Sequence, residues 1–202
     1  MALTTYAELQ TAISDRLSRV DLTATVAQEC IALCEAEMQR VLKTLDQETK
    51  DAAFSIGAEY VTAPTGLQAV RSFVLNTGPR TALEQMTSDM QSRSYNTSGK
   101  PRFYELVGAN FRFAPVPDGT YTATIVYLAK FSPLSVSNPS NWILAAHPDA
   151  YLYGSLKHAC VKTQDAAALH EFDGMFKSAL MAIRSQANQA RWSGPGMAVR
   201  PA

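Results

Sequence analysis

The sequence predicts an α+β fold: a four-helix bundle formed by the N- and C-terminal helices, an inserted antiparallel β module and an extended C-terminal tail. Apolar residues recur at helical spacing in residues 1–46 and again in residues 140–190. Residues 47–139 instead carry short apolar or alternating runs separated by Gly, Pro and Asn, which is typical of strands and turns. Residues 191–202 include Gly-Pro-Gly, which ends the helical pattern and predicts the tail.

The N-terminal part predicts two helices. The first is expected to begin at Thr5, because Thr5 and Glu8 fit a capping box that satisfies backbone N–H groups of the first turn. Its apolar face would consist of Leu9, Ile13 and Leu17. A longer helix with one apolar stripe follows a break at residues 20–21. The stripe consists of Ala27, Cys30, Ile31, Cys34, Met38, Val41, Leu42 and Leu45.

The inserted module predicts five strands. They are expected at residues 52–56, 69–75, 103–107, 110–114 and 120–128. Short turns separate the last three, which favours an antiparallel sheet. Residues 83–93 are predicted to form a short helix or a helix-like excursion, and residues 96–101 a polar loop.

Two further helices are predicted in the C-terminal part. Pro148 suits the first position of one helix, with Asp149 in its positive first turn, and Asp165 suits the N-cap of the next. The stripe of the last helix is close to a heptad seam. It consists of Leu169, Phe172, Phe176, Leu180, Ile183, Ala187 and Ala190.

Composition excludes several classes of protein. The 202 residues contain 18 Lys and Arg and 18 Asp and Glu, so the formal net charge is zero, which is not expected of a dedicated nucleic-acid binder. The sequence has no apolar run long enough for a membrane span, no signal-peptide pattern at its start, and too few cysteines for a disulfide framework. A low content of charged residues, 18%, favours association, as in a subunit of an assembly.

The zero net charge hides an asymmetry. Residues 1–50 contain five basic and eight acidic side chains, a net charge of −3, whereas residues 151–202 contain six basic and three acidic ones, a net charge of +3. Two interpretations are open at this point. The charges can belong to ordinary solvated helix surfaces, or the C-terminal part can be a basic arm that docks on something acidic.

The sequence shows no motif of known catalytic chemistry, so we expect no catalytic residue, no metal and no cofactor. Cys30 and Cys34 have the spacing of a metal-binding pair, but both lie on the apolar stripe, where a buried thiol is ordinary. The other candidates are scattered or lie at helix-surface spacing: His147, His158, His170, Asp165, Glu171 and Asp173.

The two tryptophans have different expected roles. Trp142 follows a polar loop and precedes a helix, so it either anchors that loop to the core or binds a ligand. Trp192 opens the tail beside Arg191, so it is either an anchor in the pocket of a partner or packs against its own helix.

Six segments together resemble a known family. Among them are Glu-Ala-Glu followed by Arg at 35–40, Pro-Val-Pro-Asp-Gly at 115–119 and Asn-Trp at 141–142. The segments are residues 5–9, 31–42, 99–104, 113–121, 141–144 and 148–156. In order and spacing, over about residues 1–190, the chain is similar to the head-to-tail adaptor proteins of tailed bacteriophages, of the short-tailed type, also called connector or tail tube-like proteins.

The resemblance implies a non-enzymatic structural protein of the virion neck, made in the host cytoplasm. Such adaptors form a dodecameric ring under the portal, extend the DNA channel and give the tail a docking surface. The partners implied are further copies of the chain, the portal protein and tail or nozzle proteins. Double-stranded DNA would pass through the lumen without specific binding, and no membrane is involved.

Two hypotheses about residues follow from this resemblance. A ring uses interfaces in which one face of a subunit fits the opposite face of the next, so Glu29, Glu35 and Glu37 are expected to complement Lys157, Lys162 and Lys177 of another copy. The tail is expected to order on binding the portal or another partner. Its contact residues would be Arg191, Trp192 and Arg200.

Two other functions stay open at this point. One is another neck component with a similar outline, such as a second adaptor or a tail nozzle subunit. The other is a small enzyme or nucleic-acid-binding module with an unrecognised site.

Overall fold

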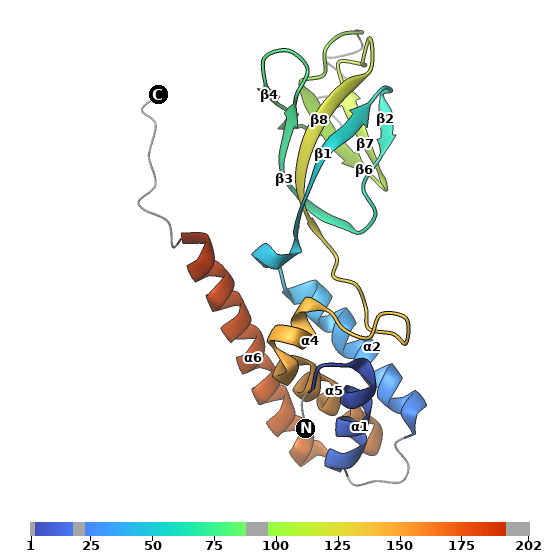
Figure 1. Cartoon of the computed structure of the whole chain (residues 1–202), viewed down its shortest axis with the longest axis vertical. Coiled ribbons are helices and arrows are strands. Elements are labelled where there is room, and N and C mark those ends of the chain that lie inside the picture. Colours follow the sequence, from blue (N-terminus) through green and yellow to red (C-terminus); the bar gives the residue numbers. More distant parts are fainter. Residues whose placement is uncertain (1–2, 18–22, 88–96, 193–202) are drawn as a thin grey trace. The chain divides into compact units, whose positions relative to one another are not determined.

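The computed structural model describes residues 3–17, 23–87 and 97–192, and it contains two compact units (Figure 1). One unit consists of Met1–Asp46 and Phe131–Ala202, and the other of Gln47–Lys130. They are called here the helical unit and the β-rich unit. The helical unit also takes in residues 131–139, which we expected to belong to the β insertion, because Phe131 and Leu134 are buried in the helical core.

The helical unit is built around a central helix, α5. Its helices are α1 (Tyr6–Leu17), α2 (Ala24–Val41), α4 (Trp142–Ala146), α5 (Pro148–Thr163) and α6 (Ala166–Trp192), and the 3₁₀ turn η1 (Leu45–Gln47) begins in this unit and ends at the first residue of the other. Helix α5 packs against α1, α2, α4 and α6 (Figure 1). The chain thus combines helices and strands as predicted, while the arrangement of the longer helices as a four-helix bundle stays a prediction.

Local signals in the sequence account for the helix ends. The capping box is confirmed: the Thr5 N–H donates to Glu8 Oε2 at 2.9 Å, and the Glu8 N–H donates to Thr5 Oγ1 at 3.3 Å. Asp165 accepts from a backbone N–H of the first turn of α6, as predicted. Asn141 caps α4 in the same way, but α4 has only five residues and was not predicted, because so short a segment shows no helical period.

The predicted stripes of α1, α2 and α6 form the helical core. Leu9, Ile31, Met38 and Phe176 of these stripes are completely or almost completely buried there, together with Tyr151 of α5, which no predicted stripe included. In α6 the burial is concentrated in the middle of the stripe, whereas Ala187 is half-buried and Ala190 is exposed. The last helix therefore extends beyond the part of the core that it covers.

The β-rich unit consists of two four-stranded sheets. Their strands are β1 (Glu48–Ile56), β2 (Tyr60–Thr62), β3 (Leu67–Leu75), β4 (Thr81–Ala82), β5 (Glu84–Gln85), β6 (Phe103–Val107), β7 (Asn110–Ala114) and β8 (Tyr121–Ala129). One sheet has the order β1-β8-β3-β4 and the other β2-β7-β6-β5. Aromatic side chains from both sheets share one core, so the sheets pack face to face.

All five predicted strands are present. They do not form a single antiparallel sheet, however, but are divided between the two sheets. Strand β8 pairs with β1 and β3, while β7 pairs with β6 and β2, and β5 pairs with β6 in parallel.

The prediction of a helix at residues 83–93 is wrong for its first part. Leu83 is buried, its N–H donates to Phe73 O at 2.7 Å, and the next residues form β5. Residues 88–93 lie outside the described part of the chain.

The predicted boundary between the last helix and the tail also changes. Helix α6 runs to Trp192, so Arg191 and Trp192 belong to the helix and not to the tail. The break predicted at residues 20–21 and the remaining tail, residues 193–202, lie outside the described residues.

Candidate interaction surface

Lys157 of α5 joins three helices of the helical unit. Its Nζ lies 2.7 and 2.8 Å from the two carboxylate oxygens of Glu37 on α2 and 3.1 Å from Asp173 Oδ1 on α6. It also lies 5.1 Å from the centre of the Phe176 ring. Only 14% of the Lys157 side chain is exposed, so this ion pair has much less solvent around it than a surface pair.

The surroundings of Lys157 keep it charged. Burial by itself lowers the pKa of Lys157, but hydrogen bonds to Glu37 and Asp173 raise that pKa above its ordinary value. Asp173 also pairs with Lys177 at 2.6 Å, and this contact, followed by that with Lys157, lowers the pKa of the Asp173 carboxyl. These four residues form one charged network across α2, α5 and α6.

A second pair, Glu29 on α2 and Lys162 on α5, lies on the surface. The two side chains form an ion pair and are both about half exposed, 57% and 49%. A pair so open to solvent stabilises the fold by at most about 1 kcal/mol.

Glu35 is buried, unlike its two acidic neighbours on α2. Its Oε1 accepts the Leu134 N–H at 2.7 Å and the Tyr151 O–H at 3.0 Å. The Asn141 amide donates to Tyr151 Oη at 2.6 Å and to Ser132 O at 3.0 Å. Burial raises the pKa of Glu35, and the two hydrogen bonds oppose that change. Glu35 therefore ties the segment that returns from the β-rich unit to α2 and α5.

The structure thus gives the six predicted interface residues contacts within one chain. Glu29 pairs with Lys162, Glu37 with Lys157, and Lys177 with Asp173, while Glu35 contacts none of the three lysines in these pairs. The opposite charges at the two ends of the chain do meet, but on neighbouring helices. Complementarity of these charges between copies stays a prediction.

A groove lies beside the end of α6. It is lined by Leu45, Asp46, Trp142, Ala146, His147, Ile183, Gln186, Ala187 and Ala190. Helix α6 runs past this groove, and Arg184 and Arg191 on its last turns are exposed. Trp142 packs against the helical core and also lines the groove. Of the three predicted tail residues, Arg191 and Trp192 end α6, and Arg200 lies outside the described residues.

The two cysteines expected to be buried, Cys30 and Cys34, are buried, Cys34 in the main helical core and Cys30 in a small cluster with Ala159. Cys30, Cys34 and Cys160 are buried and free, and burial raises the pKa of each thiol. Within residues 3–17, 23–87 and 97–192, no group of three or more His, Cys, Asp or Glu side chains could hold a metal ion. None of the helices in this part of the chain combines the length and the apolar character needed to cross a membrane.

Two features of these surfaces were not predicted from the sequence. Glu35 was placed off the apolar stripe, although it lies four residues from Ile31 and three from Met38, both buried, so its spacing did indicate the inner face. The groove was missed because η1 and α4 form one wall, and neither gives a periodic signal.

Comparison with known proteins gives one family. The family model described as SU10 adaptor protein matches residues 4–200, nearly the whole chain. No curated protein is similar enough to the chain to count as a match.

Proposed function

Since the chain belongs to the SU10 adaptor protein family, as the resemblance to phage adaptors predicted, we propose that it joins the portal of a bacteriophage head to the tail. The observation that carries this proposal is the extent of the match, which includes both the helical unit and the β-rich unit. The role is structural and places the protein in the virion neck.

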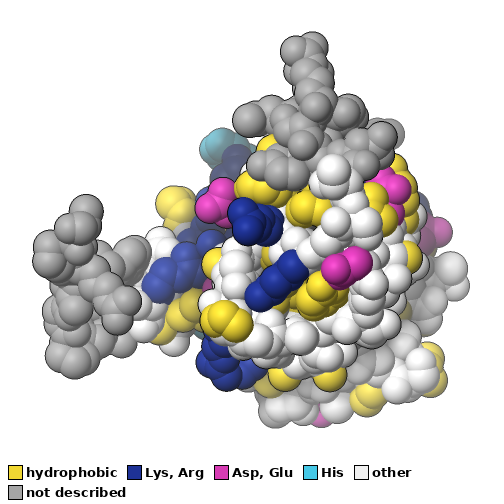
Figure 2. Space-filling view, turned by 90° about the horizontal axis from the view of Figure 1, so that it is seen from above, with side chains coloured by type: hydrophobic (Ala, Val, Ile, Leu, Met, Phe, Trp, Pro, Cys, Tyr) yellow, Lys and Arg dark blue, Asp and Glu magenta, His cyan; other side chains and the backbone are white. Residues whose placement is uncertain are grey.

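We further propose that copies of the chain form a closed ring, dodecameric as in the adaptors it resembles, with a DNA channel. A channel wall should not hold phosphates, because each Lys or Arg contact would retard the passage of DNA. The net charge of zero supports this. On the face drawn in Figure 2 the Lys and Arg side chains lie mainly in the left half of the view, so we do not assign this face to the channel wall. Duplex DNA passes through such a ring without specific binding.

The end of α6 is the part we propose to bind the portal. Arg184 and Arg191 are exposed there, and Trp192 and Arg200 follow in the sequence. Tryptophan and arginine are enriched among the residues that carry most of the binding energy of protein interfaces. The groove beside α6 offers a partner apolar surface next to these charges.

The test removes residues 192–202 and measures binding to purified portal by size-exclusion chromatography and electron microscopy. We expect the full chain to add a ring to the portal and the truncated chain to lose that ring while keeping the unfolding midpoint of the full chain. Undiminished binding would show that the end of the chain is not the portal contact. If the ring were found below another adaptor and away from the portal, the protein would be a second adaptor or a nozzle subunit.

A further inference from the structure

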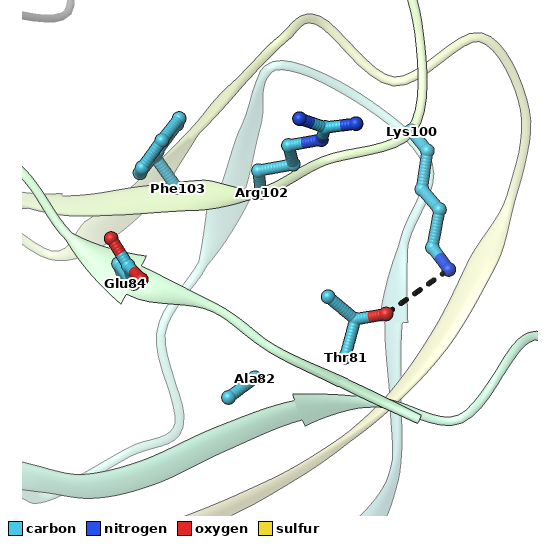
Figure 3. Close-up of a pocket in the computed structure, with 6 residues that line it drawn as sticks. All are labelled: Thr81, Ala82, Glu84, Lys100, Arg102 and Phe103. Atoms are coloured by element: carbon cyan, nitrogen blue, oxygen red, sulfur yellow. Dashed lines mark hydrogen bonds between the residues drawn. The ribbon is translucent and has the colours of Figure 1, made fainter. Parts of the chain in front are cut away.

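The β-rich unit has a charged hollow beside β4 and β5, which are edge strands of its two sheets. Strand β4 is the last strand of one sheet and β5 is the last strand of the other. The hollow beside them is lined by Thr81, Ala82, Glu84, Lys100, Arg102 and Phe103 (Figure 3). Lys100 and Arg102 come from the segment that leads into β6, and the Glu84 N–H donates to Arg102 O at 3.0 Å, which holds this segment against β5.

The two cations of the hollow have no carboxylate partner among the described residues. Lys100 Nζ donates to Thr77 O at 3.3 Å and to Thr81 Oγ1 at 3.4 Å, and both acceptors are neutral. Arg102 is exposed, and in Figure 3 its guanidinium points away from Glu84. Arg80, which directly precedes β4, is also exposed.

Other arginines of the same unit are neutralised. Arg71 Nε lies 3.4 Å from Glu48 Oε1, and Arg112 Nε lies 2.8 Å from Glu59 Oε1. The hollow is therefore a place where positive charge is gathered on the surface without the internal ion pairs formed elsewhere in the unit.

We propose that this hollow binds a side-chain carboxylate from an acidic segment of a partner protein. The Arg102 guanidinium suits a carboxylate, which accepts two charge-assisted hydrogen bonds from arginine, and the Lys100 ammonium adds a second positive charge to the same hollow. Ala82 and Phe103 supply apolar contact for the methylene groups that carry the carboxylate. The site is separate from the portal contact proposed for α6 and does not depend on it.

A protein carboxylate fits this hollow better than a DNA phosphate. Binding to duplex DNA gains its strength from several cations that follow the phosphate backbone, and the hollow offers a single compact group. Glu84 on its rim repels a continuous line of phosphates, whereas an acidic side chain can approach Arg102 from the side away from Glu84.

The experiment measures binding of a labelled oligoglutamate peptide to the full chain by fluorescence anisotropy at low salt. Duplex DNA carrying the same label is the second probe. The test variant is Arg102→Gln, and the matched control is Lys50→Gln, which removes one exposed positive charge from β1 of the same unit. We expect Arg102→Gln to weaken peptide binding about ten-fold, because it removes charge-assisted hydrogen bonds, and the control to weaken it less than about two-fold.

A second variant is expected to strengthen peptide binding, which a folding defect would not do. Glu84→Gln removes the negative charge on the rim and should tighten peptide binding about two-fold to three-fold. Equal weakening by Arg102→Gln and Lys50→Gln would show general charge attraction and overturn the proposal. Tighter binding of DNA than of the peptide, weakened by Arg102→Gln, would assign the hollow to nucleic acid and also overturn it.

Discussion

The helical unit and the β-rich unit are stabilised by different kinds of contact. In the β-rich unit, Phe73 lies at the centre of an aromatic cluster, with ring centres 5.3 to 5.6 Å from those of Phe54, Tyr104, Phe111 and Phe113. In the helical unit the helices approach closely and are tied by polar groups that are little exposed, above all Glu35, which is buried, and Lys157, which is 14% exposed. The stability of the β-rich unit therefore depends mainly on filled volume, and that of the helical unit on the close approach of its helices and on hydrogen bonds and ion pairs between little-exposed groups.

The largest effect should come from loss of volume in the aromatic cluster. Phe73→Ala removes the ring that four others contact, and we expect the free energy of unfolding of the β-rich unit to fall by about 4 kcal/mol. Hydrogen exchange measured by mass spectrometry should show faster exchange in the strands and little change in the helices. Equal acceleration in both units would mean that they unfold as one, and the comparison would fail.

The helical unit should respond most to added volume. A Cβ at position 154 would lie 2.3 Å from Cys34 Sγ and 2.7 Å from the Phe176 ring, so Gly154→Ala forces α2 and α6 away from α5. We expect a loss of about 3 kcal/mol in chemical denaturation followed by tryptophan fluorescence, since both tryptophans belong to the helical unit.

Gly174→Ala is the matched control, because this glycine also lies in a helix but has nothing within 4 Å of the added Cβ. It should stabilise the unit by up to about 1 kcal/mol through helix propensity. If Gly154→Ala were as stable as the original chain, close approach at α5 would not be what holds this unit together.

Removing the buried carboxylate of Glu35 should have the next largest effect. Glu35→Ala leaves the Leu134 N–H and the Tyr151 O–H without their acceptor, which should destabilise the helical unit by about 2 kcal/mol. Glu35→Gln keeps an acceptor oxygen at the same place and should be much milder.

The stability difference between the Glu35→Gln variant and the original chain should change with pH in a definite direction. The pKa of Glu35 is raised in the folded state, so its contribution is fully present below the ordinary value of 4.5 and is lost as the pH rises through the folded-state pKa. The Gln variant lacks this loss. Its stability relative to the original chain should therefore increase as the pH rises above 4.5, and an unchanged difference across that range would contradict the raised pKa.

The sequence predicted the elements of each unit better than their pairing. The spacing of apolar residues and the capping residues were sufficient to predict α1, α2, α5, α6 and the longer strands, because each of these signals is local. Nothing local indicates that β8 pairs with β1 and β3, both more than 40 residues away, and β2, β4 and β5 are too short to show alternation. The corner at Leu83 was predicted as helix, and that error also hid the hollow around Lys100 and Arg102.

The sequence showed that the two ends of the chain carry opposite charges, but it did not show which side chains pair within the chain. The net charges of the two ends indicated that α2 and the C-terminal helices attract each other. Helices that neighbour each other in one chain and helices that meet between copies give the same sums, so composition could not distinguish the two. The distances around Lys157 assign at least that charge to contacts within the chain.

The smallest effect on stability should come from Lys162→Gln. Both members of the Glu29–Lys162 pair are about half exposed, so its loss should change the free energy of unfolding by less than about 1 kcal/mol. Lys157→Gln removes an ion pair whose lysine side chain is only 14% exposed, so it should lower the free energy of unfolding by about 1.5 kcal/mol under the same conditions.

The informative measurement is then ring assembly on the portal by both variants. Loss of the ring by Lys162→Gln at unchanged stability would mean that this pair, although satisfied within one chain, also sets the fit between copies. An intact ring would leave Lys162 with only its contact to α2, and the interface between copies would have to be sought on other faces of the molecule.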